Sequence, residues 1–152
     1  MNKLKIAIGA DHKGYDHKQA IIKYLKENNI DVIDKGPFST ESVDYPDFAK
    51  EVCLAVKNKE ASFGILICYT GIGMSMVANK YQSIRAALVG KVENAKLTRN
   101  HNDANVLCMG AKDTDISLSI EIVKTFIEEQ FEGGRHIARV NKIKEVEKLE
   151  KR

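Results

Sequence analysis

Short apolar runs alternate along the chain with longer stretches in which apolar residues recur at helical spacing. In one of these longer stretches, Leu118, Ile122 and Phe126 repeat every fourth residue and so share one face of a helix. The apolar runs have the length of buried strands and are separated by polar or glycine-containing segments typical of turns. We expect strands at residues 4–9, 30–34, 63–68, 84–89 and 104–109.

This alternation of strand and helix predicts an α/β fold. Apolar strands separated by helices are typical of a parallel sheet that is buried on both faces. We therefore expect a doubly wound, Rossmann-like sheet of five parallel strands with helices on both faces. The length of 152 residues suits a single domain over residues 1–152, and no repeat or low-complexity linker divides it.

The last part of the chain predicts a highly charged helix over about residues 136–150. Its apolar residues form a narrow stripe, three residues apart: Val140, Ile143, Val146 and Leu149. Such a stripe can pack on its own domain or on a partner subunit. The pattern leaves both alternatives open.

Composition narrows the possible functions. Hydrophobic residues make up 43% and charged residues 30% of the chain, and no apolar run approaches the roughly 18 residues that a membrane span requires. The amino-terminal run lacks a small-residue cleavage site, so we expect a first strand and a cytoplasmic protein. A net charge of +3 from scattered lysines gives no reason to expect nucleic-acid binding but is compatible with a small anionic ligand.

The three cysteines are far apart and form no C-x-x-C pair, which argues against a disulfide framework and a structural zinc site. Cys53 and Cys108 lie inside apolar stretches and are expected to be small buried hydrophobes. Cys68 differs because it ends a strand and faces the start of a predicted helix, where a thiol pKa is lowered. Its thiolate is a candidate nucleophile or base, although a merely buried thiol is also compatible with the spacing.

Parallel sheets bind ligands beyond the carboxyl ends of their strands, so the residues that flank the apolar runs are candidates for chemistry. These residues are Asp11 and His12 after the first run, Cys68, Thr70, Gly71 and Gly73 after the third, and His101, Asn102 and Asp103 before the fifth. A helix that starts near Gly73 would offer unpaired amides to an anion, although the two glycines also fit a tight turn without a ligand. The glycine pattern matches neither the dinucleotide fingerprint nor the P-loop.

Two further groups of polar residues stand out. His12 and His101 lie in polar surroundings, whereas His17 sits on a lysine-rich helical face where solvation is the default. Arg135 and Arg139 are one helical turn apart, a spacing that suits a phosphate clamp because each guanidinium offers a planar fork of donors. As a bare pattern, the same pair also fits a solvated helix start.

Seven ordered blocks resemble ribose-5-phosphate isomerase type B, in a family that also includes galactose-6-phosphate isomerase. The blocks are GADHKGY, VIDKG, DYPDFA, GILICYTGIGMSMVANK, IRAALV, RNHNDANVLCMGAK and FEGGRHIARV, and the similarity runs from about residue 4 to about residue 145. The HND and GGRH blocks are more similar to the ribose-5-phosphate enzymes than to the galactose-6-phosphate subunits. Met74 stands where one branch of the family has a glutamate base, which points to the branch that uses a cysteine.

The resemblance implies a metal-independent and cofactor-independent interconversion of ribose 5-phosphate and ribulose 5-phosphate, a step of the pentose phosphate pathway. It implies that Cys68 moves a proton between C1 and C2 through an enediolate and that His101 helps to open the sugar ring. A thiol with a modestly lowered pKa suits this role, because a base works best when its pKa is near the operating pH.

Other roles also follow from the resemblance. The amides of Gly71, Ile72 and Gly73 would stabilise the enediolate, and the Thr70 hydroxyl would assist transfer between O1 and O2. The resemblance thus implies that the glycine turn contacts the reacting end of the sugar and not its phosphate. The phosphate would bind His12, Arg135 and Arg139, and the sugar oxygens would contact Asp11, Tyr45 and Asn102.

Two positions depart from the family pattern. Tyr69 stands where the family usually has glycine, and a left-handed backbone at this residue would cost roughly 1–2 kcal/mol. Lys112 replaces an arginine that often completes the phosphate site, so it keeps the charge but loses the planar fork. The resemblance also implies a homodimer or a tetramer, with pockets shared between subunits. The alternatives are an isomerase for another phosphorylated aldose, such as allose 6-phosphate or galactose 6-phosphate, and a sugar-phosphate binding protein without enzymatic activity.

Overall fold

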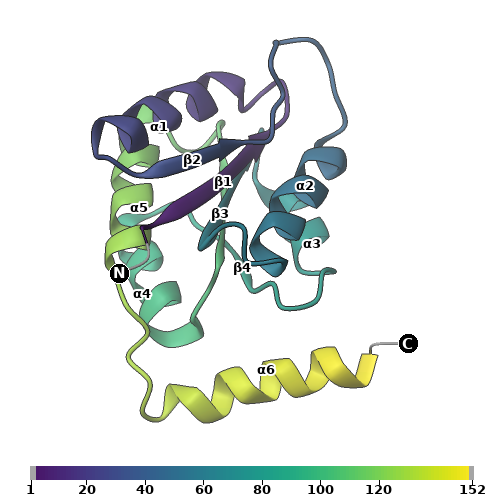
Figure 1. Ribbon diagram of the computed structural model, residues 1–152, viewed down its shortest axis with the longest axis vertical. Coiled ribbons are helices and arrows are strands. Elements are labelled where there is room, and N and C mark those ends of the chain that lie inside the picture. The colour runs from purple at the N-terminus through teal and green to yellow at the C-terminus, as the bar shows by residue number, and fades with distance from the viewer. Residues whose placement is uncertain (1–2, 151–152) are drawn as a thin grey trace.

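The computed structural model describes residues 3–150 and contains one sheet of five parallel strands in the order β2-β1-β3-β5-β4 (Figure 1). Each expected apolar run contributes one strand, with ends that shift by up to two residues. The strands are β1 (Lys5–Ala10), β2 (Asp31–Asp34), β3 (Phe63–Cys68), β4 (Ala86–Leu88) and β5 (Val106–Gly110). The predicted five-stranded parallel α/β fold is therefore confirmed.

Among the described residues, one helix follows each strand, and a sixth helix comes after the fifth. They are α1 (Tyr15–Glu27), α2 (Tyr45–Lys57), α3 (Ile72–Ala78), α4 (Val92–Asn102), α5 (Ile116–Glu128) and α6 (His136–Glu150). Between residues 3 and 150, none of them is both long and apolar enough to cross a bilayer.

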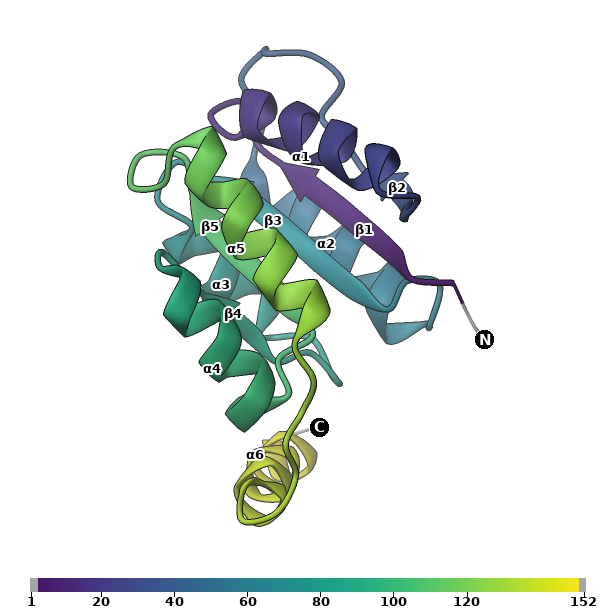
Figure 2. The same cartoon turned by 90° about the vertical axis from the view of Figure 1, so that its left-hand side faces the viewer.

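The sheet separates two layers of helices (Figures 1 and 2). On one face α1, α4 and α5 form a core in which Ile21, Leu25 and Phe126 are fully buried. On the other face α2 and α3 bury Val52 and Met74. Because apolar side chains cover both faces of the central strands, their residues read as continuous hydrophobic runs in the sequence.

The strand order places the functional edge of the sheet. From β1 the chain moves outward to β2 and then returns to β3 on the other side of β1. This reversal makes the carboxyl ends of β1 and β3 the switch point of the sheet, the place where open α/β sheets bind ligands. The start of α1 packs tightly there, since a Cβ on Gly14 would lie 2.5 Å from the Ile67 carbonyl oxygen.

A buried lysine holds the end of β2 against α1. The Nζ atom of Lys18 lies 2.9 and 3.0 Å from the two carboxylate oxygens of Asp34 and 2.7 Å from Oε1 of Gln19. Asp34 also accepts the amide N–H of Gly36 at 2.9 Å. Lys18 is fully buried, so these bonds replace its lost hydration. They fix the path by which the chain leaves β2 toward the ligand-binding edge.

The carboxyl-terminal helix α6 stands away from the two layers (Figures 1 and 2). Of the predicted apolar stripe, Val140 is buried against its own chain, whereas Ile143, Val146 and Leu149 are exposed by 48%, 61% and 76%. The first turn of α6 is therefore anchored to this chain. Most of its apolar stripe is left available to another surface.

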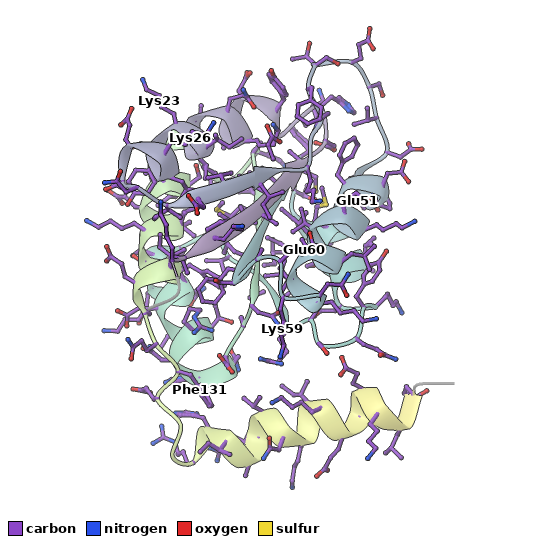
Figure 3. All side chains as sticks on the ribbon, in the orientation of Figure 1. Lys23, Lys26, Glu51, Lys59, Glu60 and Phe131 are labelled. Atoms are coloured by element: carbon purple, nitrogen blue, oxygen red, sulfur yellow. The ribbon has the colours of Figure 1, made fainter. Side chains whose placement is uncertain are left out.

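Replacing Lys18 should destabilise the protein by leaving the Asp34 carboxylate without its main partner. We expect Lys18→Met to lower the free energy of unfolding by roughly 1–3 kcal/mol in urea denaturation. Lys23 lies on the same helix with an 80% exposed side chain that points to solvent (Figure 3). The control Lys23→Met should change stability by less than about 0.5 kcal/mol. Equal effects of the two substitutions would contradict the structural role of Lys18.

Candidate active site

The candidate site at the carboxyl ends of β1 and β3 begins with Asp11. This buried residue follows β1, and its Oδ1 accepts the amide N–H groups of Lys13 at 2.9 Å and Gly14 at 3.1 Å. Its own amide N–H donates to the Ile67 carbonyl oxygen at 3.1 Å. The Asp11 carboxylate is thus fixed beside the end of β3, with Oδ2 left for another donor.

Cys68 is the last residue of β3 and is only 5% exposed. The chain turns sharply after it, because Gly71 takes a left-handed conformation with φ of 78°. This turn directs the Gly71 amide N–H back to Cys68 Sγ at 3.1 Å. A Cβ on Gly71 would lie 2.7 Å from the Met109 carbonyl carbon, so both the backbone and the space require glycine. The turn therefore holds one amide donor on the sulfur.

The adjoining residues close the turn. The amide N–H of Ile72 donates to Thr70 Oγ1 at 3.3 Å. The backbone of Thr70 packs on β5, since a Cβ on Gly110 would lie 2.4 Å from its carbonyl oxygen. Of the amides expected to hold an enediolate, those of Gly71 and Ile72 thus have partners within the turn. A substrate oxygen at the Ile72 amide would take the place of the Thr70 hydroxyl.

Tyr45 covers the start of α3. It is the first residue of α2, and a Cβ on Gly73 would lie 2.5 to 2.6 Å from its ring and hydroxyl oxygen. The tyrosine ring therefore lies directly on Gly73, next to the turn that holds Cys68. Glycine at position 73 is required for this approach.

His12 follows β1 at the same edge of the sheet. Its Nδ1 accepts the amide N–H of Val43 at 3.2 Å, which leaves the proton of the neutral ring on Nε2. The bond orients the ring, and the free Nε2–H can donate to an anion.

Tyr69 and Lys112 lie at the rim. Tyr69 is half exposed, and it is not among the described non-glycine residues with positive φ, so the expected strain of a left-handed backbone is absent. Its carbonyl oxygen accepts the Lys112 amide N–H at 2.8 Å, and the Lys13 ammonium lies 5.7 Å from its ring. Lys112 itself is exposed. The turn accepts the tyrosine because its side chain points outward.

The remaining candidates lie at the opposite end of the sheet. Helix α4 runs back from the end of β4 to the start of β5, so His101 and Asn102 in its last turn lie near the amino ends of the strands. The start of α6 lies at this same end (Figure 1); Arg139 is in its first turn and Arg135 directly precedes it. Within a single chain, His101 and Asn102 therefore lie at the other end of the sheet from Cys68. The crossover helix α4 runs antiparallel to the strands. Its last turn is therefore separated from Cys68 by about the length of a strand, ~16 Å.

His101 forms a compact group with His136 and Glu132. The two imidazole rings stack with centroids 4.2 Å apart and an angle of 14° between their planes. Oε1 of Glu132 lies 3.4 Å from Nε2 of His101 and 3.6 Å from Nε2 of His136. Burial lowers the pKa of His136 below its ordinary value, and the nearby charges of His101 and Arg135 lower it further. Sequence reasoning missed Glu132, which has no distinctive spacing.

The two arginines expected to clamp phosphate are exposed neighbours. Nη1 of Arg139 lies 3.5 Å from the Arg135 carbonyl oxygen, so the second guanidinium folds back along the helix start. Both side chains are open to a ligand or to a second chain.

The other two thiols are structural, as predicted. Cys53 and Cys108 are fully buried in the core beneath α2 and α3. Burial raises the pKa of Cys53 to about 12 and also raises the pKa of Cys108. Both remain protonated at neutral pH, so neither competes with Cys68 as a base.

Comparison with known proteins decides the family. The family model described as Ribose/Galactose Isomerase matches residues 6–143. The chain belongs to this family. It is a sugar-phosphate isomerase, as the seven sequence blocks indicate.

Relatives match over nearly their whole length. Ribose-5-phosphate isomerase B of Escherichia coli is 46% identical, over 94% of this chain and 96% of its own. The structure of Clostridium thermocellum ribose-5-phosphate isomerase B has a TM-score of 0.94 at 47% identity and covers 96% of this chain and 99% of its own. A structure of the Mycoplasma genitalium enzyme with bound ribulose-5-phosphate has a TM-score of 0.93 at 43% identity and covers 97% and 99%.

Gly73→Ala should disturb the site more than the fold. The added methyl group requires the Tyr45 ring to move, and a flexible ring can do so without unfolding the helix. We expect the kcat/KM of isomerisation to fall roughly 10- to 100-fold, with little change in thermal midpoint. The matched control is Gly90→Ala, since a Cβ there meets nothing within 4 Å. Unchanged kinetics in Gly73→Ala would exclude a role for the Tyr45 position.

Proposed function

We propose that this protein interconverts ribose 5-phosphate and ribulose 5-phosphate through an enediolate, with Cys68 as the base. The observation that carries the proposal is the Gly71 amide N–H that points at Cys68 Sγ from 3.1 Å. This backbone amide is a hydrogen-bond donor held at the atom that would take the proton. The position of Cys68 at the carboxyl end of β3, beside the switch point of the sheet, adds support.

The proposed reaction balances without a cofactor or a metal. The Cys68 thiolate takes the proton from C2 of the open aldose, and the electron pair forms the double bond of the enediolate. The thiol then returns the proton to C1, while a proton moves from O2 to O1 with the help of the Thr70 hydroxyl. Asp11 and Tyr45 lie beside this turn and are placed to contact the sugar oxygens.

A complete pocket in this proposal requires two chains. Cys68 and His101 lie at opposite ends of the sheet, farther apart than the length of a five-carbon sugar phosphate. We propose a homodimer in which one copy supplies Cys68 and His12 and the second supplies His101 for ring opening. From the second copy, Asn102 would contact the sugar, and Arg135 and Arg139 would bind the phosphate.

The surface of α6 supports a second copy. A groove of about 810 Å³ lies between α6 and the segment 79–87 and is lined in part by Tyr81, Ile143 and Val146. It does not include Cys68, so it is a poor candidate for the reaction site itself. Its apolar lining, together with exposed Leu149, suits the packing of another chain.

The nearest rival is an isomerase for a hexose phosphate, such as allose 6-phosphate or galactose 6-phosphate. The family model covers galactose as well as ribose isomerases, and the same base serves both. The HND and GGRH blocks favour the pentose, and ribulose-5-phosphate is bound in the Mycoplasma genitalium relative. A sugar-phosphate binding protein without activity would explain a ligand site at this edge of the sheet. It would not explain the amide donor placed on the Cys68 thiol.

The test of the function is isomerisation in deuterated water followed by NMR. With ribose 5-phosphate we expect ribulose 5-phosphate and deuterium at C2 of the recovered aldose, faster than with either hexose phosphate. Cys68→Ala should lower the rate roughly 10²- to 10⁴-fold with the fold intact. The control Cys53→Ala removes a buried thiol and should stay active. Near wild-type turnover by Cys68→Ala would remove the proposed base, and binding without exchange would favour the binding protein.

Mixed dimers test whether the pocket is shared. Cys68→Ala and the double variant Arg135→Ala/Arg139→Ala should each be nearly inactive alone. When the two are co-expressed and mixed dimers form at random, one pocket of each mixed dimer regains both halves, so about a quarter of the wild-type activity should return. Co-expression that restores no activity would show that both groups act within one chain.

A further inference from the structure

We infer that His101, Glu132 and His136 form a binding site for a divalent transition-metal ion of the Zn²⁺ class, and that its occupancy inhibits the enzyme. The ligand atoms of the three residues all lie within 4.8 Å of one another. The metal ion takes no part in the proposed proton transfer at Cys68. Its inhibitory effect rests on the proposed role of His101, whereas metal binding does not.

The distances suit tetrahedral coordination. Bonds of about 2.0–2.1 Å from zinc to nitrogen and oxygen place neighbouring ligands roughly 3.3–3.4 Å apart. Oε1 of Glu132 lies 3.4 Å from Nε2 of His101 and 3.6 Å from Nε2 of His136. The stacked imidazoles would need to rotate so that both nitrogens converge on one ion. Two histidines and a carboxylate leave a fourth position for water.

Backbone and side-chain hydrogen bonds hold the two segments that supply these ligands. The Glu132 amide N–H donates to the Asn100 carbonyl oxygen at 3.0 Å, next to His101 on α4. Nδ2 of Asn100 donates in turn to the Gln130 carbonyl oxygen at 2.8 Å. The His136 amide N–H bonds the Gly133 carbonyl oxygen at 3.0 Å. The loop that carries Glu132 is therefore tied to α4, which lowers the entropic cost of assembling the ligands.

The end of α4 is equally well fixed. Asp103 closes this helix in a left-handed conformation, with φ of 48°. The buried Arg99 guanidinium bonds Oδ1 of Asp103 at 3.0 Å and the Ala104 carbonyl oxygen at 2.7 Å. The His101 backbone thus has little freedom to leave the cluster.

The ligand set selects a class of ion. Imidazole nitrogens favour zinc, copper and nickel, whereas magnesium and calcium prefer sites made only of oxygen. Arg135 and Arg139 lie nearby and oppose any cation, which the Glu132 carboxylate partly offsets. The ion would be coordinated by the Nε2 lone pair of His101. This histidine could then no longer act on the sugar ring.

The binding test uses untagged full-length protein in the Cys68→Ala background, which removes that thiol as a competing ligand. Calorimetric titration with ZnCl₂ should show one saturable site per chain. Adding His136→Ala or Glu132→Gln should weaken binding at least tenfold, whereas Glu128→Gln, at an exposed acid of α5, should have no effect. MgCl₂ should not bind. Absence of saturable zinc binding, or binding that ignores both substitutions, would overturn the site.

An activity assay tests the inhibition. Zinc should inhibit wild-type turnover of ribose 5-phosphate, a chelator should reverse this, and Glu132→Gln should resist zinc relative to its own metal-free rate. Zinc binding at the cluster without inhibition would overturn the regulatory part of the inference. If the protein binds zinc as expected but does not isomerise ribose 5-phosphate, the proposed function fails and the metal site stands.

Discussion

The proposed chemistry depends on one contact, the amide N–H of Gly71 directed at the sulfur of Cys68. The contact exists because the chain reverses through a left-handed residue directly beneath Met109, where a side chain has no room. Gly110 allows β5 to support the turn, and Tyr45 packs on the residues that follow it. Cys68 therefore differs from the other buried thiols, because it ends a strand and its sulfur accepts a hydrogen bond from a backbone amide.

The direction of the sheet imposes the second constraint. Parallel strands gather the ends of β1 and β3 at one edge, and the crossover helix α4 then carries His101 to the other. Short connections offer no way to bring these groups together within one chain. In the proposed homodimer, association therefore completes the active site. The exposed apolar stripe of α6 has the same explanation, since Ile143, Val146 and Leu149 remain exposed while α6 contacts its own chain through Val140 and the Ser83–Glu147 hydrogen bond.

Much of this architecture could be predicted from the sequence, because a doubly covered parallel sheet leaves continuous apolar runs. All five strands and the helix that starts at His136 lie where the pattern predicts them. The spacing along the sequence could not predict at which end of the sheet His101 lies, because this position depends on the direction of the strands and of α4. The strain expected at Tyr69 is absent, since Gly71 takes the left-handed position two residues later.

Individual polar contacts between distant residues could not be predicted from the sequence. Lys18 looks like one of many solvated lysines, but it is fully buried against Asp34. His17 looks solvated for the same reason, yet its Nε2 lies 2.7 Å from the Thr114 carbonyl oxygen. Glu132 gains its neighbours only through the fold. Such pairs join distant parts of the chain, so no local pattern marks them.

Alkylation of Cys68 tests the central claim most directly. Iodoacetamide at neutral pH should modify Cys68 well before Cys53 and Cys108, whose raised pKa values keep them as buried thiols. Peptide mass spectrometry should show that activity falls in proportion to Cys68 modification and that ribose 5-phosphate slows both. Full activity in protein whose Cys68 is completely alkylated would contradict the account.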